Sequence, residues 1–552
     1  MIGVILSTAP VVQVHSYRIT GRVSLKEAVP DLKRVDVAES PSRGSGWVPF
    51  LFMEVYQDSA PNQYTHWGNS HRPLFRNGDS ICIAFRRIES SPGTGRIGVA
   101  WSFNGGSTWN VRGNINYDAG LAYEGGRYPN CAGFNSAGEP VVAWPELKPG
   151  FVWGKNCVAV VKSTGPVGVC QTLDPEYDSV YHNIAWRVSG NIYAVVGFTS
   201  NEAIVGFLFN ASTGQKVPGS EVILRDPNLA EDILMYDLSI KGDTLYVVGY
   251  NSAEGDGIVK IYYNGSSLVT DPVPPSLGGS SVVESHDICC FAVSIGSNTF
   301  DVLGYGAYSF TIDRFGRGWS VYALRDTTVF PLPNRNPGHI IVHHRWDENR
   351  LAIFAPWTGS GVDFSKPVYN PRVTVDKTNP SKRVVSWIQY NNNPAGCGGS
   401  NFDKSIFYAA TSNSGYTWGI NSATNPTHRV DFHFPAIDRG ADYTYSGDVL
   451  TVTYLKPMNG VTDLYCNLIS NGTAPSYVYV ATEMVSYSSG SSEDTVILSV
   501  GERGKLSIRG EAEIYDIKGS LVAKTKGDGV LNLRKGIYFI RANGRVYKVI
   551  IR

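Results

Sequence analysis

The chain has 552 residues, and its 48 acidic side chains balance 48 basic ones, so the formal net charge at pH 7 is zero. A neutral chain has no long-range field to gather nucleic acid or an anionic membrane, and neither is expected as a partner. Its 59 glycines, 30 prolines and 31 tyrosines are typical of a turn-rich all-β protein. Low net charge weakens the repulsion between copies, which makes self-association easier. No stretch is long and apolar enough to span a membrane as a helix.

Residues 1–16 are apolar and β-prone, with no basic region in front. Two interpretations stay open: a strand of the mature protein, or the remnant of a signal peptide that ends near Ser16. As a strand at a chain end, it could complete an open sheet edge on another copy. Residues 47–58, WVPFLFMEVYQD, are expected to be the outer strand that closes the last sheet, or part of a small N-terminal module.

A hairpin pattern recurs from about residue 70 to about residue 455. Its clearest copy is residues 127–146, RYPNCAGFNSAGEPVVAWPE: an apolar strand, a polar turn and a second strand that ends on an aromatic. Further copies begin at His71, Val180, Leu234, His286, His339, Tyr369 and Phe434.

Most copies begin about fifty residues apart, the spacing expected when each hairpin is the inner half of a four-stranded blade. The pattern therefore predicts a β-propeller over residues 17–480, including its N-terminal strands. Eight hairpins allow seven or eight blades. We expect seven, with the His339 hairpin as an elaboration, because it begins only about thirty residues before the next copy.

Two octapeptides in this region, SFNGGSTW (102–109) and TSNSGYTW (411–418), share one pattern. The short polar residue in third place can bond to the turn backbone, glycine permits positive φ, and tryptophan can pack between sheets. Both resemble the Asp-box of sialidase-like propellers, with Asn in place of the usual Asp, which the turn role tolerates. The resemblance implies a structural turn and says little about activity. The matching residues are Ser102, Asn104, Gly106, Thr108, Trp109, Thr411, Asn413, Gly415, Thr417 and Trp418.

The resemblance also raises the question of a glycosidase. A sialidase would need an arginine cluster for the substrate carboxylate, a Tyr and Glu pair, and an Asp acid. The family marks its first arginine with Arg-Ile-Pro, and the nearest matches are Arg127-Tyr128-Pro129 and Arg72-Pro73. The first follows an Asp-box where the family places it before, and the second lacks the middle residue. We therefore assign no catalytic residue.

Cys157 and Cys170 fall opposite each other if Ser163 and Thr164 lie at the centre of a hairpin turn. Cβ atoms of such a pair lie about 4.5–5.5 Å apart, close enough for a disulfide, and two free buried thiols are the alternative. No Cys-x-x-Cys pair occurs, and His339 and His343 are about 13 Å apart on a strand, so no metal site is predicted. No cofactor is expected, and calcium held through backbone carbonyls stays an open alternative.

Residues 481–493 form a Ser-rich linker, and residues 494–552 alternate short apolar runs with KG, GDG, RKG and NG turns. This predicts a small Ig-like β-sandwich. The segment resembles the C-terminal sorting domain of the type IX secretion system of Bacteroidota, on IYDIKGSLV (514–522), LNLRKGIYFIRA (531–542) and VYKVIIR (546–552). The resemblance implies contact with that secretion machinery and a location outside the cell or on the outer surface of a Gram-negative-type bacterium. The family commonly loses this domain on export; we expect it to be kept here, with cleavage as the open alternative.

Together these features predict a secreted cell-surface protein with a structural or adhesive role. We expect it to self-associate by strand addition into an extracellular filament or sheath, with surface glycans as further partners. The alternative is a carbohydrate-active enzyme, a sialidase-like glycoside hydrolase, or a glycan-binding propeller that uses the pocket where the inner strands converge. An enzyme should show Arg, Glu and Asp side chains together in that pocket, whereas a structural subunit should show an ordinary polar channel.

Overall fold

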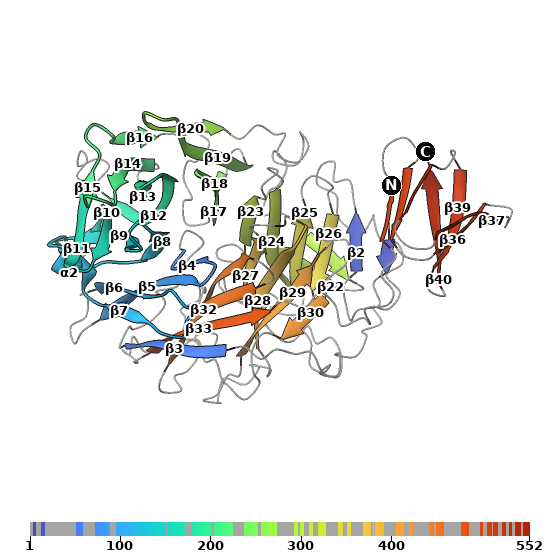
Figure 1. The fold of residues 1–552 in the computed structure, drawn as a ribbon, viewed down its shortest axis with the longest axis horizontal. Coiled ribbons are helices and arrows are strands. Elements are labelled where there is room, and N and C mark those ends of the chain that lie inside the picture. Colours follow the sequence, from blue (N-terminus) through green and yellow to red (C-terminus); the bar gives the residue numbers. More distant parts are fainter. Residues whose placement is uncertain are drawn as a thin grey trace. The chain divides into compact units, whose positions relative to one another are not determined.

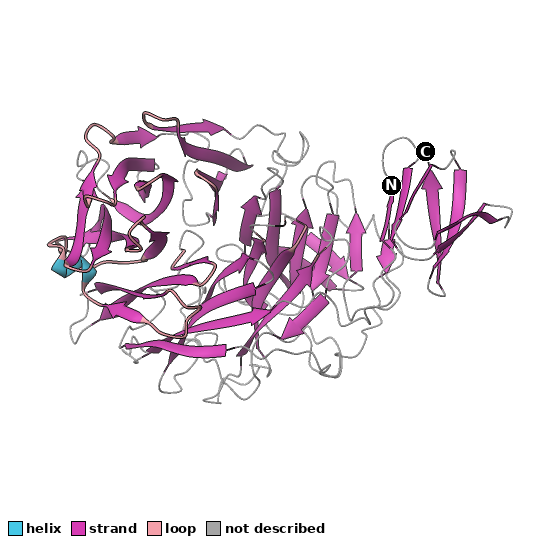
Figure 2. Cartoon of the chain, in the orientation of Figure 1, coloured by secondary structure: helices cyan, strands magenta, loops and turns pink. Residues whose placement is uncertain are grey.

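The computed structural model describes residues 4–6, 13–16, 51–58, 72–88, 95–150, 152–171, 179–199, 204–224, 237–251, 255–272, 292–295, 298–302, 308–312, 318–326, 340–345, 350–354, 368–376, 379, 381–390, 404–412, 419–422, 441–446, 449–457, 476–484, 497–500, 505–509, 512–516, 521–525, 529–532, 536–542 and 545–551. The chain divides into two compact units, Met1–Ser488 and Ser489–Arg552. Most of the described residues are in strands, and the helix among them is one short turn, α2 (Ile115–Asp118) (Figure 2). The all-β prediction is therefore confirmed.

The first unit begins its series of antiparallel sheets after residue 71 (Figure 1). The first sheet comprises β4 (Leu74–Asn77), β5 (Ser80–Ile88), β6 (Gly95–Ser102) and β7 (Asn110–Arg112). The second comprises β8 (Asn130–Phe134), β9 (Pro140–Lys148), β10 (Val152–Lys162) and β11 (Gly165–Gln171). The third comprises β12 (Val180–Ser189), β13 (Ile192–Thr199) and β14 (Ile204–Asn210), with β15 (Gln215–Lys216) and β16 (Val222–Leu224) paired to β14. One pair of residues, Gly154 and Val180, joins the second sheet to the third.

Four further sheets follow in the same unit. The fourth comprises β17 (Asp237–Lys241), β18 (Thr244–Asn251), β19 (Gly255–Tyr263) and β20 (Leu268–Pro272). The fifth comprises β21 (Ala292–Ile295), β22 (Asn298–Val302), β23 (Tyr308–Ile312), β24 (Gly318–Asp326), β25 (Ile340–Arg345) and β26 (Arg350–Phe354), extended by β1 (Val4–Leu6) and β2 (Gln13–Ser16). The sixth comprises β27 (Val368–Val375), β28 (Arg383–Tyr390), β29 (Lys404–Thr411) and β30 (Gly419–Ser422). The last comprises β31 (Ala441–Ser446), β32 (Val449–Pro457), β33 (Ser476–Met484) and β3 (Leu51–Asp58).

All eight hairpins expected from the sequence are antiparallel strand pairs. The pairs are β4–β5, β8–β9, β12–β13, β17–β18, β21–β22, β25–β26, β27–β28 and β31–β32. The β8–β9 turn shows why the sequence forms a hairpin at these positions. The Asn135 side-chain Oδ1 accepts the backbone N–H groups of Ala137 and Glu139, both at 2.9 Å, and Gly138 takes the φ of +78° that the turn needs.

The innermost strands of these sheets are β4, β8, β12, β17, β23, β27 and β31, and they follow one another around a shared cavity. Strand β31 contacts β4, β4 contacts β8, and β8 contacts β12; β17 contacts β23, β23 contacts β27, and β27 contacts β31. The indole N–H of Trp186 on β12 donates to the carbonyl of Asp243, just after β17, at 2.8 Å, which joins the third sheet to the fourth. Antiparallel sheets set radially around a centre are the arrangement of a β-propeller.

The expectation that every repeated hairpin is the inner half of its sheet is wrong in the fifth sheet. Strands β22 and β23 pair with one edge of β24, and β25 pairs with the other edge. Because β23 contacts both β17 and β27, the inner half is β23–β24, and the His339 hairpin, β25–β26, is the outer half. A hairpin pattern reports local pairing, whereas the position of a hairpin relative to the centre depends on strands far away in sequence.

The N-terminal part of the chain contributes outer strands to two sheets. β3 pairs with β33 from Leu51 opposite Thr482 to Asp58 opposite Ser476, so it is the outer strand of the last sheet, as expected for residues 47–58. β33 continues to Met484, past the expected boundary at residue 480, because its alternating pattern continues. β2 pairs with β26 of the same chain, with Gln13 opposite Ile353. The N-terminal segment is thus seated on an edge of its own chain, and residues 17–50 lie outside the described residues.

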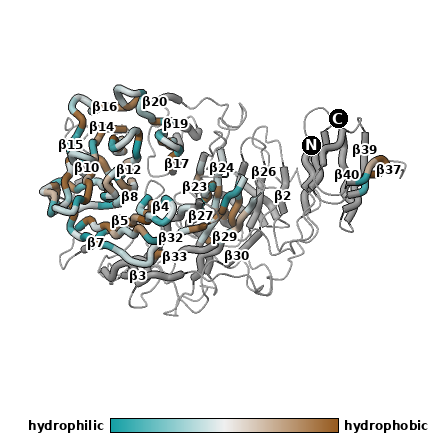
Figure 3. The backbone as a smooth tube through the Cα atoms, in the orientation of Figure 1, coloured by the Kyte–Doolittle hydropathy of each residue, from teal (hydrophilic) through white to brown (hydrophobic). Residues whose placement is uncertain are grey.

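The core of the first unit lies between neighbouring sheets, where the apolar faces of the strands meet. Figure 3 shows hydrophobic residues along the strands of these sheets. Trp144 and Ile97 are fully buried between the first two sheets, and Trp319 and Trp387 between the fifth and sixth. Each such side chain contributes roughly 1.5–3 kcal/mol by leaving water.

The second unit also consists of antiparallel strands. Its described residues form one sheet of β34 (Ile497–Val500), β35 (Lys505–Arg509) and β38 (Gly529–Asn532), and another of β37 (Leu521–Thr525), β36 (Ala512–Asp516), β39 (Gly536–Ala542) and β40 (Arg545–Ile551). The three segments that carry the sorting-domain resemblance lie on β36–β37, β38–β39 and β40. Of the linker expected at residues 481–493, residues 481–484 belong to β33, and residues 485–493 fall outside the described residues.

Candidate functional site

The candidate site is the central cavity, a space of about 790 Å³ lined by residues of all the innermost strands. Its lining also includes residues of the turns that follow those strands, such as Ser136 and Gly138 after β8 and Gly242 after β17. The cavity is therefore bounded by strands that come from the whole length of the first unit.

The charged side chains of the described lining are mostly cationic. Five cationic side chains line the cavity: Arg72, Arg76, Arg187, Lys241 and Arg372. Asp376 is the one carboxylate among the described lining residues. Arginine stays protonated at any ordinary pH, so a cavity lined in this way favours anionic ligands.

Arg72 is held at both backbone groups and at its side chain. Its N–H donates to Asn130 Oδ1, and its carbonyl accepts the N–H of Cys131 at 3.0 Å. Its guanidinium donates through Nη2 to the carbonyl of Leu238 on β17, so the side chain reaches from the first sheet to the fourth. Arg72 is thus fixed in position rather than free to follow a ligand.

Arg76 and Arg187 are also oriented by neighbours. Arg76 donates through Nε to the Gly78 carbonyl at 2.9 Å and through Nη1 to Thr451 Oγ1 of the last sheet. Burial lowers the pKa of Arg76, and the nearby Asp79 carboxylate opposes that shift. Arg187 donates through Nε and Nη2 to the Tyr193 hydroxyl, at 3.3 and 3.2 Å.

Tyr193 links Arg187 to the second sheet. Its hydroxyl donates to the carbonyl of Phe134 on β8 at 2.7 Å. Burial raises the pKa of Tyr193, and the hydrogen bond from Arg187 opposes the rise. The Tyr193 hydroxyl therefore accepts from Arg187 and donates to β8, which positions Arg187.

One wall of the cavity is aromatic. Phe75, Phe103 and Phe134 all line it, and the ring centroids of Phe103 and Phe134 lie 5.1 Å apart. Phe134 also meets Phe75 edge to face at 6.0 Å. The cavity combines guanidinium groups, phenyl rings and small polar side chains, the mixture found in sites for polar ligands with an apolar face.

Asp376 is built into a turn. It is buried, and its Oδ1 accepts the N–H of Asn379 at 3.1 Å. Glycoside hydrolysis generally uses two carboxyl groups about 5–10 Å apart on either side of the scissile bond. The described lining supplies one, and it contains neither tyrosine nor glutamate.

The residues expected from the first octapeptide form a closed hydrogen-bonded turn between β6 and β7. Ser102 Oγ accepts the Gly106 N–H at 2.9 Å, and Asn104 Oδ1 accepts the Thr108 N–H at 2.9 Å. Asn104 Nδ2 donates to Thr108 Oγ1 at 2.8 Å, and Gly106 has a φ of +92°. Trp109 packs on the core between the first and last sheets. The Asn104 side chain thus bonds within its own turn.

In the second octapeptide, Thr411 is buried at the end of β29. The other residues of this octapeptide lie outside the described residues: Asn413, Gly415, Thr417 and Trp418.

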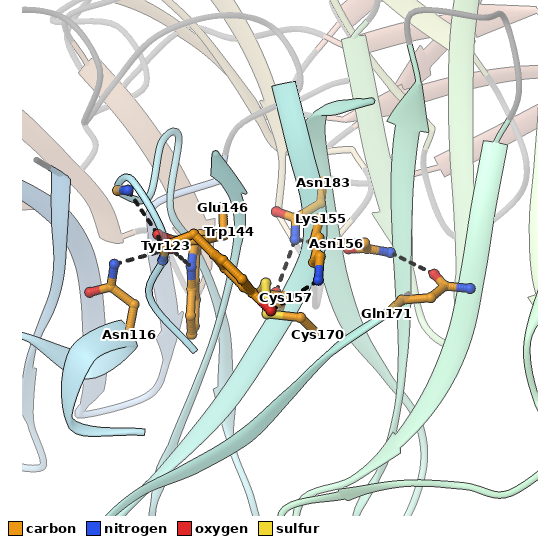
Figure 4. Close-up of a disulfide and its surroundings, with 11 residues drawn as sticks. Asn116, Tyr123, Trp144, Glu146, Lys155, Asn156, Cys157, Cys170, Gln171 and Asn183 are labelled. Atoms are coloured by element: carbon orange, nitrogen blue, oxygen red, sulfur yellow. Dashed lines mark hydrogen bonds between the residues drawn. A yellow bond between two sulfur atoms is a disulfide. The ribbon is translucent and has the colours of Figure 1, made fainter. Parts of the chain in front are cut away.

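Cys157 and Cys170 are directly opposite each other on β10 and β11 and form a disulfide, with Cα atoms 4.0 Å apart (Figure 4). A second disulfide, Cys82–Cys131, joins the first sheet to the second across 49 residues of sequence. The sequence did not predict it, because the two cysteines share no hairpin. Cys131 also lines the cavity.

Beside the Cys157–Cys170 disulfide, buried amides connect the second sheet to the third (Figure 4). Asn183 Nδ2 donates to Asn156 Oδ1 at 3.0 Å and to the Cys157 carbonyl at 3.0 Å. Gln171 Nε2 donates to the Gly206 carbonyl at 3.1 Å. The sequence does not predict this network, because amide side chains give no pattern until distant strands are placed side by side.

Of the two sequence matches to a sialidase arginine, the structure brings Arg72 to the cavity, and Arg127 is not among the described lining residues. Arg127 Nη1 donates to the Gly126 carbonyl at 3.2 Å.

His343 is buried on β25 beside Trp319, with ring centroids 5.5 Å apart, and His339 lies outside the described residues. Within the described ranges, no cluster of three or more His, Cys, Asp or Glu side chains could hold a metal ion. A search of the same ranges finds no helix with the length and apolar character needed to cross a membrane.

No protein-family model matches the chain, and a search of curated proteins finds no match. Solved structures with a distant likeness include PorZ, a bacterial surface component of the type IX secretion system of Porphyromonas gingivalis; the match covers 88% of this chain but 59% of PorZ, at 10% identity and a TM-score of 0.37. The endosialidase of phage phi92 matches over 91% of this chain and 87% of its own, at 9% identity and a TM-score of 0.36. The polysaccharide lyase Uly1 matches over 77% of this chain and 92% of its own, at 7% identity and a TM-score of 0.41. Likenesses this distant carry no information about the ligand of this chain.

Proposed function

We propose that this chain is an extracellular, seven-bladed β-propeller that binds carboxylated glycans in its central cavity. The observation that carries the proposal is the charge of the described lining, with five cationic side chains against one carboxylate. A carboxylate that enters such a site can accept charge-assisted hydrogen bonds from arginine, which are about twice as strong as neutral ones. The innermost strands that line the cavity support the blade count.

Binding fits the described lining better than hydrolysis does. Arg72, Arg76 and Arg187 are fixed by neighbouring groups, as a preorganised clamp requires. The single carboxylate, Asp376, already accepts a bond from its own turn. A binding role therefore needs no group beyond those in the described lining.

An extracellular location has two independent supports. The Cys82–Cys131 and Cys157–Cys170 disulfides form and persist in oxidising compartments such as the periplasm and the cell surface. The resemblance of residues 494–552 to a type IX sorting domain points the same way. The role at the surface would be adhesion to acidic glycans.

Calorimetric titration of the purified chain tests this proposal. The probes are tetragalacturonic acid, which carries uronate, sialyllactose, which carries sialate, and cellotetraose, which is neutral. We expect one of the acidic probes to bind and cellotetraose not to bind. The two acidic probes distinguish the two sources of a sugar carboxylate.

The double variant Arg187→Gln with Lys241→Gln removes two lining charges. Its affinity for the acidic probe should fall at least about tenfold, because a hydrogen bond to a charged group contributes roughly 1.5 kcal/mol or more. The matched control is Arg112→Gln with Lys155→Gln, which removes two cations outside the described lining and should leave the affinity unchanged. Equal loss in both variants, or no binding of either acidic probe, would overturn the proposal.

The filament subunit expected from the sequence is a second candidate, on one observation. β2 adds to the edge of β26 by ordinary strand pairing, and the same pairing could be made with β26 of a neighbouring copy. Negative-stain microscopy of the native chain and of a chain that lacks residues 1–16 tests this. Filaments that vanish on truncation support exchange, and dispersed particles in both samples reject it.

A further inference from the structure

Phe103 is a large apolar side chain that faces the cavity and stays exposed. It is 49% accessible to solvent, although its neighbour Phe134 is buried. A Cβ placed on Gly138 would lie 3.5 Å from Phe103 Cζ, so the ring lies over the β8–β9 turn. A phenyl ring left in water is unfavourable, and a ligand that covers it gains apolar burial.

Hydrogen bonds of the turn between β6 and β7 fix the backbone on both sides of Phe103. Ser102 and Asn104, the residues before and after Phe103, each accept backbone hydrogen bonds within the turn. Gly105 N–H donates to the Asp79 carbonyl at 2.9 Å, which ties the turn to the β4–β5 turn. The backbone of Phe103 is therefore preorganised, and a ligand need not order this segment on binding.

The surroundings of the ring indicate the kind of ligand. Arg76, Asn77 and Ser80 line the same cavity, as do Ser239, Thr311 and Thr444. Hydroxyl and amide groups suit a polyol better than an acyl chain. The C–H face of a pyranose is apolar and slightly positive, which matches the negative face of a phenyl ring.

We infer that Phe103 is the stacking platform for a sugar ring of the bound glycan. The Ser102–Trp109 turn, which the sequence indicated as a purely structural device, thereby contributes a ligand-binding residue. The inference rests on the function proposed above: the lining cations hold the carboxylate, and Phe103 selects the carbohydrate over a simple anion.

The test compares three probes on two variants by calorimetric titration. The probes are the acidic oligosaccharide that binds best, inorganic phosphate as an anion without a ring, and laurate as a carboxylate with an apolar chain. Phe103→Ala should weaken the oligosaccharide about tenfold, the typical contribution of an aromatic contact of this size, and leave phosphate unchanged. Phe103→Trp should retain the affinity, and the fluorescence of the introduced indole should change on oligosaccharide binding. The control Val111→Ala removes an apolar side chain that is 40% exposed outside the described lining and should change neither affinity.

Each outcome separates the inference from the proposed function. Phe103→Ala could leave oligosaccharide affinity within twofold while Arg187→Gln with Lys241→Gln lowers it. Phe103 would then not be a stacking platform, and the proposed anion site would be supported. If Phe103→Ala lowers phosphate and oligosaccharide equally, Phe103 supports the cavity as a whole and is not a platform. Tighter binding of laurate than of the oligosaccharide would also overturn the inference, because the ring would then serve an acyl chain. Loss of the anion site in every variant, control included, would reject both.

Discussion

The indole N–H of Trp144 donates to Glu146 Oε2 at 2.8 Å, two residues further along the same strand, and both side chains are fully buried. The Glu146 carboxylate also accepts Asn116 Nδ2 at 3.0 Å and the backbone N–H groups of Tyr123 and Gly125 at 3.0 and 2.9 Å (Figure 4). One carboxylate thus ties helix α2 and the loop after it to β9. Burial raises the pKa of Glu146, and the four donors oppose the rise.

Replacing Glu146 should destabilise the first unit strongly. Glu146→Ala leaves four buried donors without this acceptor, and we expect a loss of roughly 3–5 kcal/mol in the free energy of unfolding. Glu146→Gln presents an amide N–H₂ to two of the donors and should cost roughly 1–3 kcal/mol. Urea unfolding followed by tryptophan fluorescence measures both losses. Glu139→Gln, in the more accessible β8–β9 turn, is the control, and a comparable loss there would contradict the assignment.

His182 should make the first unit sensitive to acid. It lies between Tyr128 and Tyr181, with ring centroids 4.8 and 4.7 Å away, and burial lowers its pKa to about 3. An unfolded histidine titrates near pH 6.5, so between about pH 6.5 and pH 3 the unfolded chain binds a proton that the folded chain does not. The stability contributed by neutral His182 is complete above pH 6.5 and falls by about 1.4 kcal/mol per pH unit below it.

The variant His182→Phe keeps an aromatic ring and removes the titrating group. Between about pH 6.5 and pH 3, the stability of the variant should fall less steeply than that of the native chain, by about 1.4 kcal/mol per pH unit. Urea midpoints measured at several pH values for both proteins give the difference, in which the other titrating groups cancel. Parallel pH profiles would show that His182 is not the source of the acid sensitivity.

The two disulfides should differ in what they contribute to stability. In the chain-entropy picture, Cys157–Cys170 closes a short loop and stabilises the folded state by about 3 kcal/mol. Cys82–Cys131, with a sequence separation of 49, closes a longer loop and stabilises it by about 4 kcal/mol. Paired Cys→Ser variants, unfolded in urea, should therefore rank in that order. The reverse ranking would show that native-state packing, rather than loop length, sets the contribution.

The sequence predicted local pairing well and long-range placement poorly. The eight hairpins and the opposition of Cys157 and Cys170 depend on turn chemistry within about twenty residues, which the sequence displays directly. The Cys82–Cys131 disulfide and the β23–β24 inner half depend on which sheets become neighbours, and no local pattern encodes that. The cavity charges were missed for the same reason: Arg76, Arg187 and Arg372 are far apart in sequence and meet around one space only once the ring of sheets is closed.

The Asn104 side chain both accepts and donates hydrogen bonds within the β6–β7 turn. Asn104→Asp should change stability by less than about 0.5 kcal/mol, since Oδ1 can still accept from Ser102 and Thr108, and the Thr108 hydroxyl can reverse to donate to the carboxylate. Asn104→Ala loses all of these bonds and should cost about 1–2 kcal/mol, measured by urea unfolding. Ser163→Ala, in the exposed turn between β10 and β11, is the control. If the aspartate variant were as unstable as the alanine variant, the turn would depend on the amide N–H₂ group, and its likeness to an Asp-box would be limited to the sequence.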